Sequence, residues 1–159
     1  MSTPVLQALL LADHVYQDRS TGKHVICGVF SELRFIPPSA GGGLPHTPGT
    51  PIPVHKTIRA GSPYLYMSFT DVHGQKAFEL RYVDLRDNTT LFSTKFQIDC
   101  PDPLATVEVS LPLPALPAPH AGVYALELLY DDVLLGSHRV RIVPDTSFGG
   151  EQPARREHE

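Results

Sequence analysis

The sequence lacks several features that would assign it to a functional class. Its 159 residues include no tryptophan and only two cysteines, Cys27 and Cys100. Lys and Arg number 13 against 17 Asp and Glu, so no overall positive charge attracts a nucleic acid. No apolar run reaches the roughly 18 residues of a transmembrane helix. We therefore expect neither a nucleic-acid partner nor a membrane-spanning segment.

The N-terminal region also lacks the basic segment of an export signal. The apolar run over residues 5–12 follows Met1 almost directly, and Asp13 and His14 end it. We interpret this run as a buried strand rather than a signal segment. The protein is then expected in the cytoplasm, where both thiols stay reduced.

Most of the chain has a hydrophobic period of two residues. Apolar and polar residues alternate in most segments, and turns rich in Gly, Asn and Asp interrupt them about every 8–12 residues. The clearest hairpin rises through residues 122–130, turns at Asp131-Asp132 and returns through residues 133–142. No stretch has a convincing helical period. The pattern predicts an all-β protein, an immunoglobulin-like antiparallel β-sandwich of about seven to nine strands.

A single domain is expected, with little chain outside it. Residues 1–4 form a short leader, and residues 5–143 form the sandwich. Within the sandwich, residues 36–56 are rich in proline and glycine, so they form a long loop rather than a ladder. Residues 144–159 are polar and lack apolar periodicity, which predicts a disordered tail.

The N-terminal third is predicted to be a hairpin. Its first strand runs to about Tyr16 and its second covers residues 24–35, with a polar turn at Gly22 between them. Gly28 is expected to mark a bulge in the second strand. Cys27 shares the apolar parity of that strand, so we expect it to be a small core residue.

A proline-rich run occupies residues 111–119. Its spacing favours polyproline II, which binds to aromatic grooves on partner proteins. A strand precedes this run and another follows directly, so we favour a stiff connection that crosses from one sheet to the other.

The histidines raise the question of a metal site. The candidates are His14, His24, His46, His55, His73, His120 and His138. An odd separation places His24 and Cys27 on opposite faces of one strand, and no His-Glu-x-x-His or paired Cys-x-x-Cys spacing occurs. We expect no metal and no other cofactor. A metal-dependent enzyme built from loop histidines is the least favoured alternative.

Catalysis through a nucleophile or a carboxylate pair has little support. The chain has no Gly-x-Ser-x-Gly elbow. Cys100 lies between Asp99 and Asp102, whose charges disfavour a reactive thiolate. Asp131-Asp132 fit a hairpin turn. We therefore predict that the protein is not an enzyme and name no catalytic or cofactor-binding residue.

Three parts of the chain resemble a family of small bacterial proteins that is known only as a domain of unknown function. They are residues 5–15 with 18–23, residues 111–117, and residues 122–124 with 135–136. The resemblance implies a compact β-sandwich in a bacterial cytoplasm. It transfers no functional residue, because the family has no established activity. The Gly-Val-Tyr-x-Leu segment from Gly122 is also similar to the closing hairpin of immunoglobulin-like and fibronectin-like sandwiches.

These features together favour a non-catalytic protein-interaction or assembly module. An open sandwich has edge strands that can pair with a strand of another protein or of a second copy, so a homo-oligomer is expected as one form. A small-ligand or carbohydrate-binding sandwich is the alternative. An interaction module needs an exposed apolar patch or an unprotected edge strand, whereas a ligand binder needs a concave site with convergent polar or aromatic groups.

Overall fold

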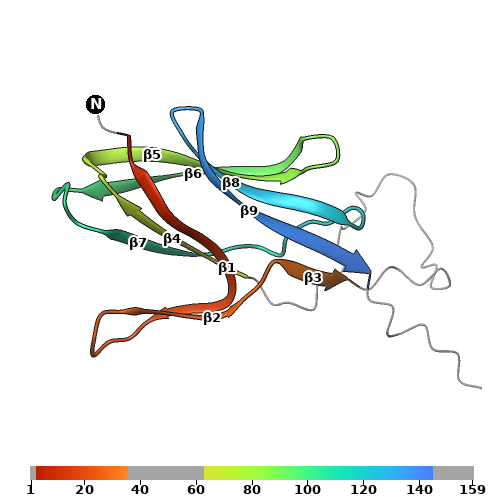
Figure 1. Ribbon diagram of the computed structural model, residues 1–159, viewed down its shortest axis with the longest axis horizontal. Coiled ribbons are helices and arrows are strands. Elements are labelled where there is room, and N and C mark those ends of the chain that lie inside the picture. The colour runs from red at the N-terminus through yellow and green to blue at the C-terminus, as the bar shows by residue number, and fades with distance from the viewer. Residues whose placement is uncertain (1–2, 36–62, 145–159) are drawn as a thin grey trace, which may run out of the picture.

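The computed structural model describes residues 3–35 and 63–144, and these residues form an all-β fold (Figure 1). The strands are β1 (Val5–Gln17), β2 (His24–Val29), β3 (Glu32–Phe35), β4 (Tyr64–Thr70), β5 (Gly74–Asp84), β6 (Thr89–Cys100), β7 (Val107–Pro112), β8 (Gly122–Tyr130) and β9 (Val133–Pro144). The described ranges contain no helix, and so none that could cross a lipid bilayer. The predictions for residues 36–56 and for the tail from residue 145 onward lie outside the described residues.

The strands form two sheets that pack face to face, which confirms the predicted sandwich (Figure 1). One sheet has four strands in the order β2-β1-β4-β7, and the other has five in the order β3-β9-β8-β5-β6. Neighbouring strands are antiparallel except β3 and β9, which are parallel. Pro144, expected to begin the tail, instead pairs with Phe35 at the end of this parallel ladder.

The core lies between the sheets and follows the alternation in the sequence. Leu65, Met67 and Phe69 of β4 are fully buried, as are Leu80 and Tyr82 of β5. Residues two apart on a strand share a face, so each strand supplies a row of apolar side chains to this layer. Each such side chain stabilises the fold by roughly 1.5–3 kcal/mol relative to exposure.

The second strand predicted from the sequence is in fact two strands in different sheets. β2 ends at Val29 on the four-stranded sheet, and β3 begins at Glu32 on the five-stranded sheet. Apolar residues occupy the odd-numbered positions on both sides of the break, and Ser31 is the one exception, so the periodicity did not separate the two strands. Gly28 has a φ of +68° just before the crossing, but the register of β1 with β2 is the same on both sides of it, so the bulge predicted there is not found.

A second, smaller cluster lies on the outer face of the four-stranded sheet. Ala12, Val15 and Tyr66 are buried there, with Ile26 of β2 packed against them. In Figure 1 the β1–β2 hairpin bends away from the first half of β1 and runs along the β4 and β7 side of the sandwich. The bend folds one face of the hairpin onto the sheet, so Tyr66 is buried outside the main core.

The connection between β7 and β8 crosses from the four-stranded to the five-stranded sheet, as the proline-rich sequence predicted. Leu113 and Leu116 anchor this connector, because both side chains are buried in the main core. The Leu113 amide also donates a hydrogen bond of 2.7 Å to the carbonyl oxygen of Pro63. The connector is therefore fixed at its start.

Candidate interaction site

The described residues contain four edge strands, two in each sheet: β2, β7, β3 and β6. Three of them carry charged residues or proline, namely Glu108 and Pro112 on β7, Glu32 and Arg34 on β3, and Lys95 and Asp99 on β6. Such residues prevent an edge from pairing with another chain. β2 reads His-Val-Ile-Cys-Gly-Val and carries none of them. Among these four strands, β2 is the one without a charged residue or proline.

The β1–β2 hairpin also has an exposed apolar face. Tyr16 pairs with Val25 across the hairpin, and Cys27 pairs with His14. Tyr16 is 55% exposed and Val29 is 54% exposed, while Cys27 is exposed as well. We call Tyr16, Val25, Cys27 and Val29 the hairpin strip. It places three exposed side chains and the half-buried Val25 next to the edge of β2.

The expectation that Cys27 belongs to the core is therefore wrong. The neighbouring parity, with Val15 and Ile26, faces the sheet and packs around Tyr66. Both faces of the hairpin carry apolar residues, so the sequence pattern does not tell which face packs against the sheet. The bend of the hairpin decides this.

Polar contacts fix the covered face of the hairpin in place. The Tyr66 hydroxyl donates a hydrogen bond to the Glu108 carboxylate, and His24 Nδ1 lies 3.3 Å from Glu108 Oε2. Burial, reinforced by Glu108, raises the pKa of Tyr66 to about 12. The hydrogen bond from Tyr66 is the main cause that lowers the pKa of Glu108. β2, β4 and β7 are thus joined through one carboxylate.

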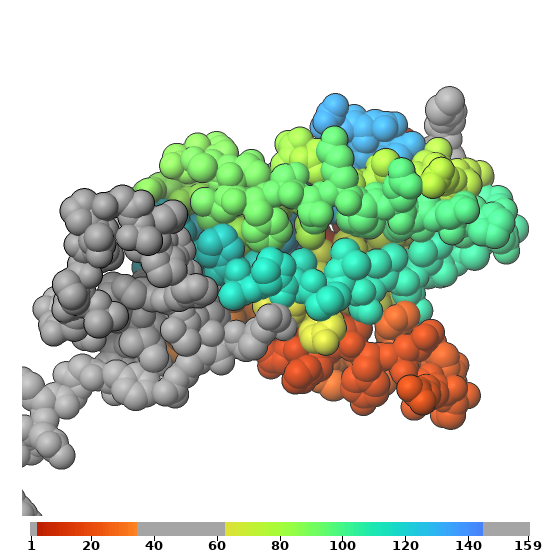
Figure 2. All heavy atoms as spheres, turned by 180° about the vertical axis from the view of Figure 1, so that it is seen from behind, coloured from red at the N-terminus to blue at the C-terminus, as the bar shows by residue number. Residues whose placement is uncertain are grey.

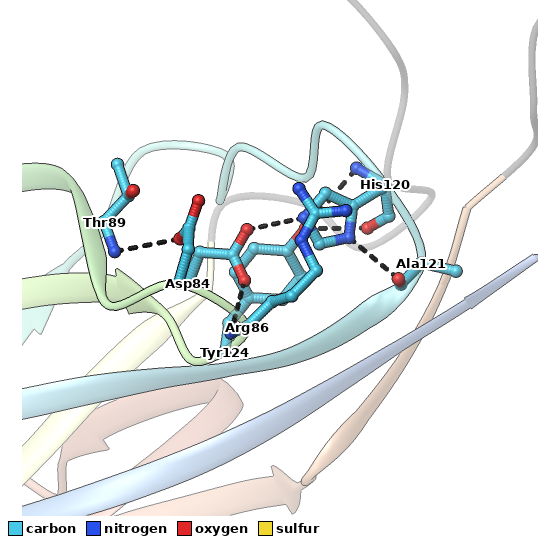
Figure 3. Close-up of polar contacts among 7 residues, drawn as sticks. Asp84, Arg86, Thr89, His120, Ala121 and Tyr124 are labelled. Carbon is cyan, nitrogen blue, oxygen red and sulfur yellow. Dashed lines mark hydrogen bonds and ion pairs between the residues drawn. The ribbon is translucent and has the colours of Figure 1, made fainter.

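A second polar cluster lies where the connector enters β8 (Figure 3). Asp84 is only 3% exposed. Its Oδ1 accepts a hydrogen bond from the Arg86 amide at 3.0 Å, and its Oδ2 lies 2.5 Å from His120 Nε2. His120 Nδ1 lies 2.8 Å from the carbonyl oxygen of Ala121. Because both ring nitrogens face acceptors, the protonated imidazolium satisfies both contacts.

The pKa of His120 is accordingly raised, first by the hydrogen bond to Ala121 and then by the one to Asp84. The fully buried Tyr124 completes the cluster, since its hydroxyl donates a hydrogen bond of 2.7 Å to the carbonyl oxygen of His120. The Asp84 oxygens and the His120 ring nitrogens are all engaged within the fold. The cluster therefore holds the connector on β8 and β5.

The other candidate metal ligands are dispersed. His138 lies 3.2 Å from the carbonyl oxygen of Leu9 and 2.9 Å from that of Phe30, so it ties β9 to the β1 side. His14 and His73 are exposed. His46 and His55 lie outside the described residues. In residues 3–35 and 63–144, no three His, Cys, Asp or Glu side chains come close enough to hold a metal ion.

The two cysteines and the carboxylate pair have ordinary surroundings. Cys27 and Cys100 are free and lie on different sheets. Cys100 is buried, and its thiol lies 3.0 Å from the carbonyl oxygen of Asp102. Asp131 and Asp132 have φ angles of 49° and 62°, which fits the predicted hairpin turn.

Neither Asp84 nor Glu108 was predicted from the sequence to have a special role. Asp84 had a signal, because it continues the inward parity of Leu80 and Tyr82 and so places a carboxylate at a buried position. Glu108 had none, since it alternates with Val107 and Val109 like any solvent-facing residue. Its role depends on the bend that brings the hairpin to β7.

Comparison with known proteins identifies no relative. No protein-family model matches the chain, and no curated protein matches it. The resemblance to small bacterial sandwich proteins therefore stays a prediction.

Proposed function

We propose that this protein is a non-catalytic protein-interaction module in which β2 pairs with an extended segment of another protein chain. The observation that carries the proposal is the composition of β2, an edge strand without charged residues or proline beside the exposed hairpin strip. A strand added to such an edge gains main-chain hydrogen bonds, and alternate side chains supply specificity. The second chain is another copy of this protein or a different protein.

An immunoglobulin-like topology is part of this proposal. The order β6-β5-β8-β9 is similar to that of strands C′, C, F and G, and β1, β4 and β7 take the places of A, B and E. The bond from Tyr124 to the carbonyl of His120 has the geometry of a tyrosine corner. β2 is then an extra strand at the edge of the sheet. The same fold serves many functions, so the edge and not the fold supports the function.

The surroundings of the polar groups support a binding role over catalysis. Glu108 and Asp84 are engaged in holding the hairpin and the connector. The exposed, unbridged Cys27 supports a reducing compartment such as the cytoplasm.

Substitutions at Cys27 test the proposal, because this side chain is exposed in the middle of β2. Cys27→Lys adds a charge to the edge, whereas Cys27→Ser keeps the edge neutral and removes the thiol. Thr106→Lys, at an exposed position directly before β7, places the same charge beside the opposite edge. We expect Cys27→Lys to weaken binding by tenfold or more, about 1.4 kcal/mol, and the two controls to bind like wild type.

The binding is measured in two stages. Native mass spectrometry and light scattering give the oligomeric state of each variant over a range of concentrations. If the wild type is monomeric, extended peptides are selected from a displayed library and titrated against each variant. A dimer or peptide complex lost in Cys27→Ser would point to a disulfide and contradict the proposal. So would a Cys27→Lys variant that binds like wild type, or a wild type that neither dimerises nor selects a peptide.

A further inference from the structure

A groove opens at the other edge of the four-stranded sheet, between β6 and β7. Its volume is about 460 Å³, and its lining residues are Leu80, Phe92, Thr94, Phe96, Leu111, Pro112, Leu113 and Pro114. Figure 2 shows the band of β6 and the band of β7 with the connector separated by a hollow, with deeper strands visible between them. The groove therefore reaches into the layer between the sheets.

The groove exists because the two sheets end at different places. Phe92, Thr94 and Phe96 share the parity of Ile98 and Cys100, which are buried in the core. Yet Thr94 is exposed and the two phenylalanines are half-buried. The four-stranded sheet ends at β7, so this part of the inner face of β6 has no strand of the described chain to cover it.

The residues that line the groove favour an uncharged ligand. None of the eight lining residues is charged, and Thr94 supplies the only side-chain hydroxyl. A charged group placed there would lose hydration without gaining a counter-charge, which is costly. The volume lies within the range of small-molecule sites, roughly 300–1,000 Å³. An uncharged, mainly apolar molecule matches this lining.

The β7 side of the groove argues against an added strand as the occupant. Pro112 and Pro114 lie on this side, and neither has an N–H group to donate. Alternate prolines block the ladder that a strand would need along β7. A small molecule needs no such ladder.

We infer that this groove binds a small, uncharged, mainly apolar ligand. Phe92 and Phe96 contact the body of the ligand, and the Thr94 hydroxyl is its hydrogen-bond partner. Both rings are held in place by aromatic side chains of the neighbouring strand β5. Phe96 stacks on Phe78 with a centroid distance of 5.6 Å, and Phe92 stacks on Tyr82 with a centroid distance of 5.4 Å. The site shares no residue with β2, so it is independent of the proposed function.

The neutral fluorophore N-phenyl-1-naphthylamine tests the inference in the full chain. Thr94→Trp fills the groove, and Gln97→Trp places the same side chain on the opposite face of β6, where Gln97 is exposed. We expect saturable binding by the wild type and by Gln97→Trp. For Thr94→Trp we expect a Kd weaker by about tenfold or more. Wild type without saturable binding, or equal binding by both variants, would overturn the inference.

Competition and mapping complete the test. Decanol is expected to displace the fluorophore, and the decanoate anion is not, so equal displacement by both would contradict a neutral site. NMR of the wild type with the fluorophore locates the site without any variant. Shifts are expected at the amides of Leu80, Thr94 and Leu111. Shifts confined to β2 would overturn the assignment to the groove.

Discussion

The two edge strands of the four-stranded sheet have the same length but different surroundings. β2 and β7 each contain six residues. β7 carries Glu108, ends at Pro112 and leads into a connector that Leu113 anchors in the core. β2 carries no charge or proline and has the exposed hairpin strip beside it. We propose that this difference leaves the edge of β2, and not that of β7, available to a partner strand.

This comparison separates stability from binding. Changes at the connector that follows β7 are expected to lower the free energy of unfolding and to leave partner binding by folded protein unchanged. Changes on the exposed side of β2 are expected to alter binding with little effect on stability.

The largest effect is expected at the start of the connector. Leu113 is 5% exposed, so Leu113→Ala removes core packing and is expected to lower the free energy of unfolding by about 2–4 kcal/mol. The control is Leu104→Ala, because Leu104 is 91% exposed and its loss should change stability by less than about 0.5 kcal/mol. Urea unfolding measures both. Similar losses in the two variants would mean that the connector is not anchored.

Gly28 tests the bend that exposes the hairpin strip. A Cβ added there would lie 2.3 Å from Asp13 Oδ2, and the φ is +68°. Gly22 has a φ of +70° with nothing within 4 Å of its Cβ position. Gly22→Ala is expected to cost about 1 kcal/mol from its backbone alone, and Gly28→Ala about 2 kcal/mol because Asp13 must also move. Thermal or urea unfolding of the pair gives the difference, and equal losses would show that Asp13 moves freely.

A smaller effect is expected from the polar cluster at the connector. Tyr124→Phe removes the 2.7 Å hydrogen bond to the part-buried carbonyl oxygen of His120, and the loss of this bond is expected to cost about 1–2 kcal/mol. Tyr16→Phe removes a hydroxyl from an exposed side chain and should leave stability unchanged. Urea unfolding of the two variants provides the comparison. A loss of stability in Tyr16→Phe as large as in Tyr124→Phe would contradict the expectation that the connector, and not the exposed hairpin, determines stability.

The smallest effect is a pH dependence from His120. Its pKa is raised in the folded protein, so its contribution to stability is complete below the unfolded value of about 6.5. The contribution is lost as the pH rises through the folded pKa. Asp84 and Arg86 lie beside the ring (Figure 3), and comparison with His120→Gln removes the contributions that the remaining titratable groups make equally in both proteins. The free energy of unfolding of wild type minus that of His120→Gln should therefore decrease from about pH 5.5 to about pH 8.5. A difference that stays constant would rule out this contribution.

The sequence predicted the features that depend on neighbouring residues. The alternation identified the strands around Leu126 and Leu128, and the positive φ angles of Gly22 and Asp131 lie at predicted turns. What it missed depends on contacts between distant residues. Parity placed Cys27 in an apolar row, but the hairpin bend determines that Ile26 is covered instead.

From the sequence, only the kind of candidate site could be predicted, namely an edge strand of a β-sandwich. Edge strands follow from an open sandwich, but their identity depends on the order of strands in each sheet. Apart from Ser31, the odd-numbered positions of residues 24–35 are all apolar, so the alternation does not reveal that β2 is an edge and β3 belongs to the other sheet. The groove likewise depends on where two sheets end, which no local pattern encodes.

The most direct test that β2 pairs with another chain is amide hydrogen exchange of the wild type, measured with and without that chain bound. The bound chain is a second copy at high concentration or a selected peptide. If β2 is the interaction edge, its outward amides gain protection on binding while those of β7 exchange at unchanged rates. Protection gained at β7, or at neither edge, would contradict the claim.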